Sequence, residues 1–316
     1  MIRVVFMGTP RFAIPTLQAI WNNEGTDLVG VITQPDRRAG RGQKIQPPPV
    51  KTIAVEHGIP IIQPQRIGDD PAVRQFLEDF RPDVAVIVAF GQLLPPRVFD
   101  FPKYGTLNLH ASLLPRYRGA APIIHALLKG DQLTGVSIMR IEQRLDSGPI
   151  LGIEELPVSS EVTAGEVEET LARVGADLLL RVLRPYVFGQ LVPEPQDEAL
   201  ATYAPAIRKA DTAVDWTCPA PRIHNLVRAF NPKPGARTTL RGGLVKLWKT
   251  RMVQEILPDV LQLPGSSTRS GTEGIRVICG DQQMIEFIQV QPENRRRMSA
   301  SQFANGVRLQ EGEVFG

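Results

Sequence analysis

The chain has 316 residues, of which 42% are hydrophobic and 22% are charged. One hydrophobic core rarely extends beyond about 250–300 residues, so this length predicts two domains. No stretch approaches the ~18 consecutive apolar residues that a membrane span requires, and we expect no association with membranes.

The counts of cysteine and histidine exclude two further classes of protein. Cys218 and Cys279 cannot build a disulfide framework, and four histidines are too few for a cluster of metal ligands. Met1 leads directly into a strand-like stretch, residues 2–7, which leaves no room for a targeting peptide. We therefore expect a cytoplasmic protein that requires no metal. We also expect it to be a monomer.

Charge is distributed unevenly along the chain, although the net charge is only +3. Residues 206–316 contain 16 Lys and Arg against 10 Asp and Glu, whereas the first 205 residues contain 20 against 23. This asymmetry favours an anionic partner for the C-terminal part. An ordinary solvated basic surface would explain the same counts equally well.

Apolar runs alternate with helical patterns through the first 190 residues. Strands are predicted at 2–7, 28–33, 59–62, 83–90, 106–111, 135–141 and 150–158. Helices are predicted at 11–21, 49–57, 69–80, 121–129 and 164–187. Strands that alternate with helices indicate a right-handed, mostly parallel α/β sheet.

The pattern changes in a stretch rich in proline and acidic residues. We interpret residues 190–208 as a linker between two domains, 1–189 and 209–316. The C-terminal domain has one predicted helix, 219–229, and several short β-like runs between glycines and prolines. These runs lie at 244–248, 256–263, 274–278 and 284–290. Their spacing predicts a small β-barrel or sandwich.

The strand at 106–111 carries an unusual pair of polar residues. Asn108 and His110 are two positions apart, so both side chains point to the same face. Strands of parallel sheets are normally apolar on both faces. The strand therefore either lies at an edge of the sheet or lines a site.

A carboxylate and a strand end complete a possible catalytic group. Open α/β sheets bind ligands at the carboxyl ends of their strands, where Asp146 and Phe90-Gly91 are also expected. Asn108 and His110 can donate hydrogen bonds to a developing oxyanion, and Asp146 can orient the imidazole or collect a proton. Taken alone, an Asp-Ser-Gly loop such as this one is usually just a turn, in which Asp146 caps its own backbone.

Only one hydroxyl nucleophile is expected near this group. Ser112 is not surrounded by the Gly-x-Ser-x-Gly pattern of a nucleophile elbow, which favours direct transfer to an external nucleophile. Gly8-Thr9-Pro10 follows the first strand but lacks the Gly-x-Gly-x-x-Gly pattern, so no nucleotide cofactor is expected.

Two segments are strongly basic. Residues 36–44 contain Arg37, Arg38, Arg41 and Lys44 together with two glycines. Guanidinium groups clamp phosphates bidentately, so this segment could be a phosphate-contacting loop, and the run 295–297 could serve the same purpose. For both segments, a solvated loop is the alternative.

Several motifs carry a family resemblance. Asn108-x-His110, Ser112-Leu113-Leu114-Pro115, Arg118-Gly119 and the downstream Asp146 resemble the 10-formyltetrahydrofolate-dependent formyltransferases. Further matches, along essentially the whole chain, are similar to the family members that act on methionyl-tRNA. They are Gly8-Thr9-Pro10-x-Phe12, the segment 34–44, Arg118 to Pro122, Asp215-Trp216, Arg228 to Pro232 and Lys246 to Trp248.

The resemblance implies a Rossmann-like formyltransferase domain joined to a C-terminal oligonucleotide-binding-fold-like β-barrel that contacts tRNA. It also implies that folate, as 10-formyltetrahydrofolate, packs near Phe90, Gly91 and Leu93, with Ser112, Leu113, Leu114 and Pro115 contributing. The basic loop of the family falls on residues 34–49, with its main arginine at Arg41. Phe12 matches the aromatic residue that senses the methionyl side chain, and Arg38 replaces a proline usual in the family.

The implied reaction is attack of the α-amine of methionyl-initiator tRNA on the formyl carbon, with no covalent enzyme intermediate. Asn108 and His110 would stabilise the oxyanion, and Asp146 would orient His110 and help to move the amine proton. Three alternatives remain open: a formyltransferase for a small amine, a formyltetrahydrofolate hydrolase, and an RNA-binding protein without catalytic activity.

Overall fold

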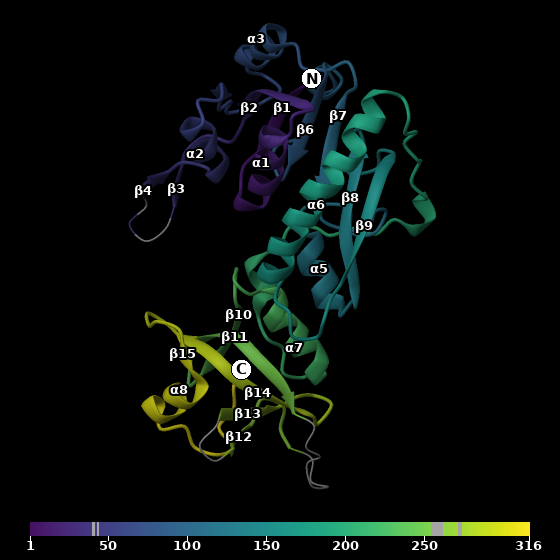
Figure 1. Cartoon of the computed structure of the whole chain (residues 1–316). Helices are drawn as coiled ribbons and strands as arrows, with labels where there is room; N and C mark the ends of the chain where they lie inside the picture. The colour runs from purple at the N-terminus through teal and green to yellow at the C-terminus, as the bar shows by residue number, and fades with distance from the viewer. Residues whose placement is uncertain (40–41, 43, 254–261, 271–273) are drawn as a thin grey trace. The chain divides into compact units, whose positions relative to one another are not determined.

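The computed structural model describes residues 1–39, 42, 44–253, 262–270 and 274–316 (Figure 1). The chain forms two compact units. The first unit comprises Met1–Ala120, Thr134–Leu156 and Glu168–Ala204, and the second comprises Ala121–Leu133, Pro157–Val167 and Pro205–Gly316. Among the described residues, no helix is both long and apolar enough to cross a bilayer.

The first unit is built on a seven-stranded sheet with the order β5-β2-β1-β6-β7-β8-β9. Its strands are β1 (Ile2–Gly8), β2 (Thr26–Ile32), β5 (Ile61–Ile62), β6 (Val84–Val88), β7 (Thr106–His110), β8 (Leu133–Arg140) and β9 (Ile150–Pro157). The four pairings from β5 to β7 are parallel, and β8 runs antiparallel to β7. The prediction of a mostly parallel α/β sheet is confirmed.

The polar strand β7 lies inside the sheet, between β6 and β8. The edge-strand interpretation is therefore wrong. In the register of the sheet, Asn108 is opposite Ile87 on one side and Met139 on the other. Paired residues share a face, so Asn108 and His110 lie on the same face as Ile87.

Helices cover this sheet: α1 (Ile14–Asn22), α2 (Pro49–Glu56), α3 (Pro71–Phe80), α4 (Pro96–Phe99) and α6 (Ala164–Val187). A Cβ on Gly175 of α6 would meet Leu109 at 2.6 Å, so Leu109 faces α6. Asn108 and His110 alternate with Leu109 and consequently face away from α6. On their side of the sheet, Met7, Ile87 and Phe90 belong to one buried apolar cluster.

Some local structure was not indicated by the sequence pattern. The segment predicted as a basic loop contains a two-stranded ribbon, β3 (Arg37–Ala39) paired antiparallel with β4 (Lys44–Gln46). The helix predicted at 11–21 begins with a 3-10 turn, η1 (Arg11–Ala13). Pro10 precedes that turn in an extended conformation, which is the usual way in which proline introduces a helix.

The second unit contains a small antiparallel sheet with the order β10-β11-β14-β13-β12, and β15 pairs with β14. Its strands are β10 (Ala236–Leu240), β11 (Gly243–Val253), β12 (Ser267–Ser270), β13 (Gly274–Ile278), β14 (Met284–Pro292) and β15 (Met298–Ser299). Phe315 bridges to Leu240 at the end of β10, and Val314 bridges to Ser266 beside β12. The two outer strands are thereby joined through the same short segment, as the predicted barrel requires.

The helices of the second unit are α5 (Pro122–Lys129), α7 (Ala220–Ala229) and α8 (Ala300–Val307), with a 3-10 turn η3 (Lys209–Thr212). Both α7 and α8 lie beyond residue 211, so the prediction of a single helix there is wrong. Ser299 accepts a hydrogen bond from the Gln302 amide and caps α8. Most of the strand predicted at 256–263 lies outside the described residues.

Much of the stretch interpreted as a linker, up to residue 204, belongs to the first unit. Glu194 bridges to Ile150, and Tyr203 bridges to Arg118, with a 3-10 turn η2 (Glu198–Leu200) between them. Residues up to Ala204 accordingly belong to the first compact unit. The domain limits at 189 and 209 stay predictions.

The core of the second unit generates a stability prediction. The Phe287 ring is fully buried, 5.2 Å from the Phe315 ring and 5.9 Å from the Trp216 ring. Phe287→Ala leaves a cavity and should lower the free energy of unfolding by about 3–5 kcal/mol in chemical denaturation. Leu263→Ala, at an exposed position of the same unit, should change it by less than about 0.5 kcal/mol. A loss below about 1 kcal/mol for Phe287→Ala would contradict its placement in the core.

Candidate active site

His110 ends β7 with its imidazole almost fully buried. The Nε2 atom lies 2.9 Å from the carbonyl oxygen of Tyr117. A carbonyl oxygen only accepts, so Nε2 must carry a proton and donate it. The other ring nitrogen, Nδ1, is left to face Asp146, whose Oδ2 lies 3.7 Å away. Nδ1 can therefore donate a hydrogen bond only when the ring is protonated.

Asp146 is held by a residue far from it in sequence. Its Oδ2 accepts a hydrogen bond of 2.8 Å from the backbone N–H of Gly119. Among the described residues, the polar contacts of this carboxylate are thus with Gly119 and His110, not with its own loop. Asp146 does lie in a turn, but its carboxylate does not cap that turn as the turn interpretation expects. The backbone of Asp146 has φ of 47°, in the left-handed region that few non-glycine residues adopt.

Asp146 does not reach His110 from the carboxyl end of a parallel strand, as expected from the sequence. Phe90-Gly91 does follow the carboxyl end of a parallel strand, β6. Because β8 is antiparallel, its carboxyl end lies beside the amino end of β7, where Ile141 donates to the carbonyl of Thr106. The loop after β8 then carries Asp146 to His110. The rule for parallel strands therefore does not account for this carboxylate.

Asn108 lies two residues before His110 on the same face and is half-buried. Within the part of the chain that the structure describes, its carboxamide makes no hydrogen bond that fixes it. The amide N–H groups of Asn108 are consequently free to donate to a ligand on this face.

Ser112 is fully buried, and its hydroxyl donates to the carbonyl of Arg116 at 2.6 Å. Its own carbonyl accepts from the Ser137 hydroxyl, which also accepts from the N–H of Leu114. A buried hydroxyl engaged in this way is not placed to act as a nucleophile. Leu114 is buried as well, whereas Leu113 and Pro115 are half-buried.

The strand end after β6 has a strained backbone. Ala89 and Gly91 have φ of 47° and 87°, and the Phe90 side chain between them is buried in the apolar cluster. The carbonyl of Phe90 accepts hydrogen bonds from Thr9 Oγ1 and Gln34 Nε2. Leu93, by contrast, is 85% exposed. Of the residues expected to contact folate here, Gly91 and Leu93 are the accessible ones.

Gln34 connects this strand end to the basic ribbon. Sequence patterns do not indicate this connection. Its Oε1 accepts from Arg37 Nη2 at 3.0 Å, while its Nε2 donates to the Phe90 carbonyl. Arg37 and Arg38 lie on β3 and Lys44 on β4, all with exposed side chains. Arg41 lies outside the described residues.

Phe12 lies in the 3-10 turn η1, with 8% of its surface exposed. Its predicted contact with a methionyl side chain stays a prediction. Among the described residues, no group of three or more His, Cys, Asp and Glu side chains could hold a metal ion.

Comparisons with known proteins show the family of the chain. The model of the formyl transferase family matches residues 2–183, and that of the formyl transferase C-terminal domain matches residues 206–308. A protein of Methylococcus capsulatus named methionyl-tRNA formyltransferase is 44% identical over 308 residues, which is 98% of each chain. Its namesake in Geobacter metallireducens is 43% identical over 316 residues, covering 100% of this chain and 99% of that protein.

Solved structures share the fold at lower identity. WlaRD, a sugar 3N-formyl transferase determined in the presence of dTDP and 5-N-formyl-THF, has a TM-score of 0.66 at 18% identity, covering 94% of this chain and 99% of that one. HypX from Aquifex aeolicus, in complex with tetrahydrofolic acid, has a TM-score of 0.63 at 16% identity, covering 96% and 46%. The chain therefore belongs to the formyltransferase family, within the group of proteins named methionyl-tRNA formyltransferase.

Proposed function

We propose that this protein transfers the formyl group of 10-formyltetrahydrofolate to the α-amino group of methionyl-initiator tRNA and so supports translation initiation. The observation that carries the proposal is the meeting of Asn108, His110 and Asp146 on one face of the sheet, in a chain 44% identical to a protein of that name. Folate and aminoacylated tRNA are the two substrates, and no metal is required in this mechanism.

The reaction begins when the α-amine attacks the formyl carbon and a C–N bond forms. Negative charge develops on the formyl oxygen, where the Asn108 amide and the protonated Nδ1 of His110 donate hydrogen bonds. Oxyanion donors of this kind typically contribute about 10²–10³ in rate. The tetrahedral intermediate collapses by breaking the bond between the formyl carbon and N10 of the folate.

Proton movement involves Asp146 and His110. The Asp146 carboxylate supplies the countercharge beside Nδ1 of the protonated ring, at 3.7 Å. The attacking amine loses a proton, which Asp146 helps to collect, and N10 gains one as tetrahydrofolate leaves. No bond to the protein forms, which agrees with the engaged hydroxyl of Ser112.

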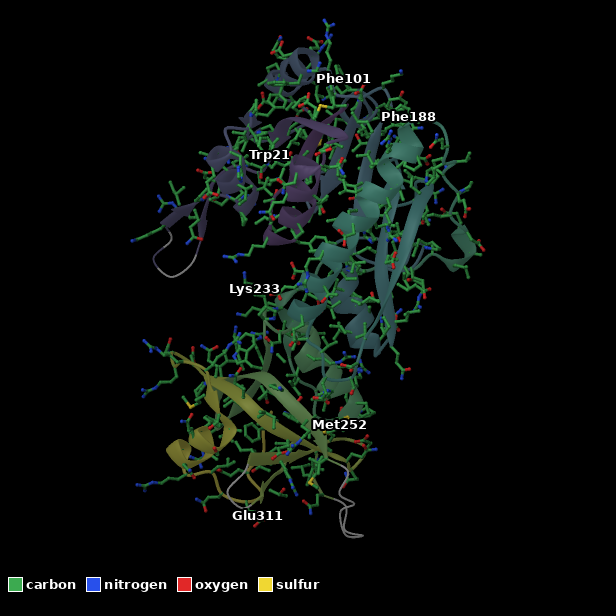
Figure 2. The ribbon with its side chains drawn as sticks, in the orientation of Figure 1. Trp21, Phe101, Phe188, Lys233, Met252 and Glu311 are labelled. Carbon is green, nitrogen blue, oxygen red and sulfur yellow. The ribbon has the colours of Figure 1, made fainter. Side chains whose placement is uncertain are left out.

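Basic side chains on both units support an RNA acceptor. Arg37, Arg38 and Lys44 present positive charge on the β3–β4 ribbon. In the second unit, the Arg297 guanidinium lies 3.6 Å from the centre of the Trp248 ring, and Lys246 lies 5.5 Å from it. Burial lowers the pKa of Arg297 from its usual value, which still leaves the group cationic at neutral pH. Lys233, on the loop before β10, is exposed (Figure 2).

One experiment separates this function from its alternatives. The protein is incubated with 10-formyltetrahydrofolate, labelled in the formyl group, and methionyl-tRNA. Label in the RNA fraction supports the proposal, whereas release of labelled formate without acceptor indicates a hydrolase. Transfer only to small amines indicates a small-molecule formyltransferase. RNA binding with no label in any product indicates an RNA-binding protein.

The catalytic roles predict large effects on turnover. Asn108→Ala, His110→Ala and Asp146→Ala should each lower kcat by about 10²-fold or more, because each removes a group that acts on the transition state. Folate binding, measured by calorimetry, should persist. Glu142→Gln, an exposed position in the same loop as Asp146, is the matched control and should retain normal turnover. Near-normal kcat in any of the three alanine variants would remove that residue from the mechanism.

The tautomer of His110 can be tested directly. Because Nε2 donates to the Tyr117 carbonyl, the neutral ring should carry its proton on Nε2. Nitrogen chemical shifts of ¹⁵N-labelled histidine distinguish the two tautomers, and His110→Ala assigns the signal. A neutral ring protonated on Nδ1 would contradict the assigned geometry.

The basic segment 36–44 predicts how the affinity for tRNA depends on salt. Arg41→Ala should weaken use of tRNA and reduce the slope of log affinity against log salt by about 1, because one phosphate contact is lost. Arg74→Ala, which removes an exposed arginine of α3 that pairs with Glu78, should leave the slope unchanged. An equal slope for Arg41→Ala and the unmodified protein would favour the solvated-loop interpretation.

A further inference from the structure

Residues 194–204, which we name the strap, run alongside the loops that hold the catalytic group. An antiparallel bridge between Glu194 and Ile150 fixes one end, and a parallel bridge between Tyr203 and Arg118 fixes the other. Every member of these pairs belongs to the first compact unit. The strap is thus part of the same body as β7 and the Asp146 loop.

Gln196 of the strap contacts the Asp146 loop through its side-chain amide. Its Nε2 donates to the carbonyl of Asp146 at 2.9 Å and to the carbonyl of Gly148 at 2.7 Å. Its Oε1 accepts from Arg118 Nε at 3.1 Å and from Nη2 at 2.8 Å. One amide group therefore uses both its donors and its acceptor to join the Asp146 loop to Arg118.

Arg118 is itself fixed by the strap. Its side chain is 1% exposed, and its guanidinium donates to both carboxylate oxygens of Glu198, at 3.1 and 2.9 Å. The hydrogen bond to Glu198 raises the pKa of Arg118 above its usual value. A buried guanidinium left without these acceptors would be strongly destabilising, so Arg118 has little freedom to move.

The backbone N–H that donates to the Asp146 carboxylate belongs to the residue after Arg118. Arg118 donates to the carbonyl of Thr202, and Ala204 donates back to the carbonyl of Arg118, at 2.8 and 2.7 Å. The following residue is Gly119, the donor to the Asp146 carboxylate. Gly119 has φ of 119°, and a Cβ there would lie 2.8 Å from the Ala204 carbonyl oxygen. The strap thus sets the position of the Gly119 N–H.

Asp146 requires such support because its left-handed backbone is unfavourable for a residue with a side chain. Conformations of this kind cost on the order of 1–3 kcal/mol and persist only where surrounding contacts determine them. Gln196 holds the Asp146 carbonyl, and Gly119 holds its carboxylate. Both restraints are linked to Arg118: Gln196 accepts hydrogen bonds from its guanidinium, and Gly119 is the next residue in the chain.

We propose that Gln196 is a positioning residue, which holds Asp146 in place beside His110 for formyl transfer. This inference rests on the proposed function for its effect on turnover. Among the described residues, Gln196 makes no hydrogen bond to Asn108 or His110, so we expect it to affect the reaction through Asp146.

The kinetic test is a double-mutant cycle with Asp146. Gln196→Ala should lower kcat by about 10-fold, since small misplacements of catalytic groups have effects of this size or larger. KM for folate and for tRNA should change by less than about twofold, because Gln196 acts on the chemical step and not on binding. In the Asp146→Ala background, the same substitution should lower kcat by less than about twofold, because the group that Gln196 positions is already absent.

Two further variants separate positioning from general destabilisation. Gln196→Glu keeps the acceptor for Arg118 but has no donor for the two carbonyls, so its kcat should fall at least as far as that of Gln196→Ala. Arg144→Gln removes only the 2.7 Å ion pair between Arg144 and Glu198 on the same strap, and its kcat should be normal. Equal losses of kcat from Gln196→Ala in the two backgrounds, or a rise in KM with normal kcat, would overturn the proposal.

Hydrogen exchange tests the positioning role of Gln196 independently of the reaction that the protein catalyses. The Gly119 amide is protected by the Asp146 carboxylate, and its hydrogen exchange in Gln196→Ala should be at least about tenfold faster than in the unmodified protein. The amides of β7 serve as the internal reference for global stability. Unchanged protection of Gly119 would overturn the positioning role, whereas absence of formyl transfer in the unmodified protein would overturn the proposed function alone.

Discussion

The hydrogen bond from His110 Nε2 to the Tyr117 carbonyl determines how the rest of the site can work. It commits one ring nitrogen to the backbone and leaves the other beside Asp146. A neutral ring then offers Nδ1 only as an acceptor, and an oxyanion requires a donor. In the proposed mechanism, His110 can therefore fill its role only with the Asp146 carboxylate beside it, at 3.7 Å.

In the proposed mechanism Asp146 must be held beside His110, and several segments of the first unit contribute to holding it there. Gly119, Arg118 and Gln196 lie on separate segments of the chain, and each restrains Asp146 or a neighbour of it. Catalytic geometry must be held within a fraction of an ångström, which one loop with strained backbone cannot achieve alone. The restraint is supplied by hydrogen bonds between residues 27 to 80 positions apart.

The alternation around Asn108 and His110 could be read from the sequence because it depends only on neighbouring residues. The apolar strands and the long helix α6 are predictable for the same reason. The position of β7 inside the sheet, the reversal of β8 and the contact of Asp146 with Gly119 are not, since they depend on partners distant in sequence. Gln196 lies in a stretch whose prolines and acidic residues resemble a flexible linker, so composition concealed its role. Helix α8 was missed because glycine and asparagine near its end weaken the helical pattern.

The bridges made by Val314 and Phe315 have a consequence for synthesis of the protein on the ribosome. The edges of β10 and β12 are bridged by this late segment, and these two bridges cannot form while residues 314 and 315 remain in the exit tunnel. The first unit has all its strands by residue 157 and can fold earlier. Until residues 314 and 315 emerge, the positions that they bridge stay unpaired, and unpaired strand edges are the surfaces most prone to aggregation.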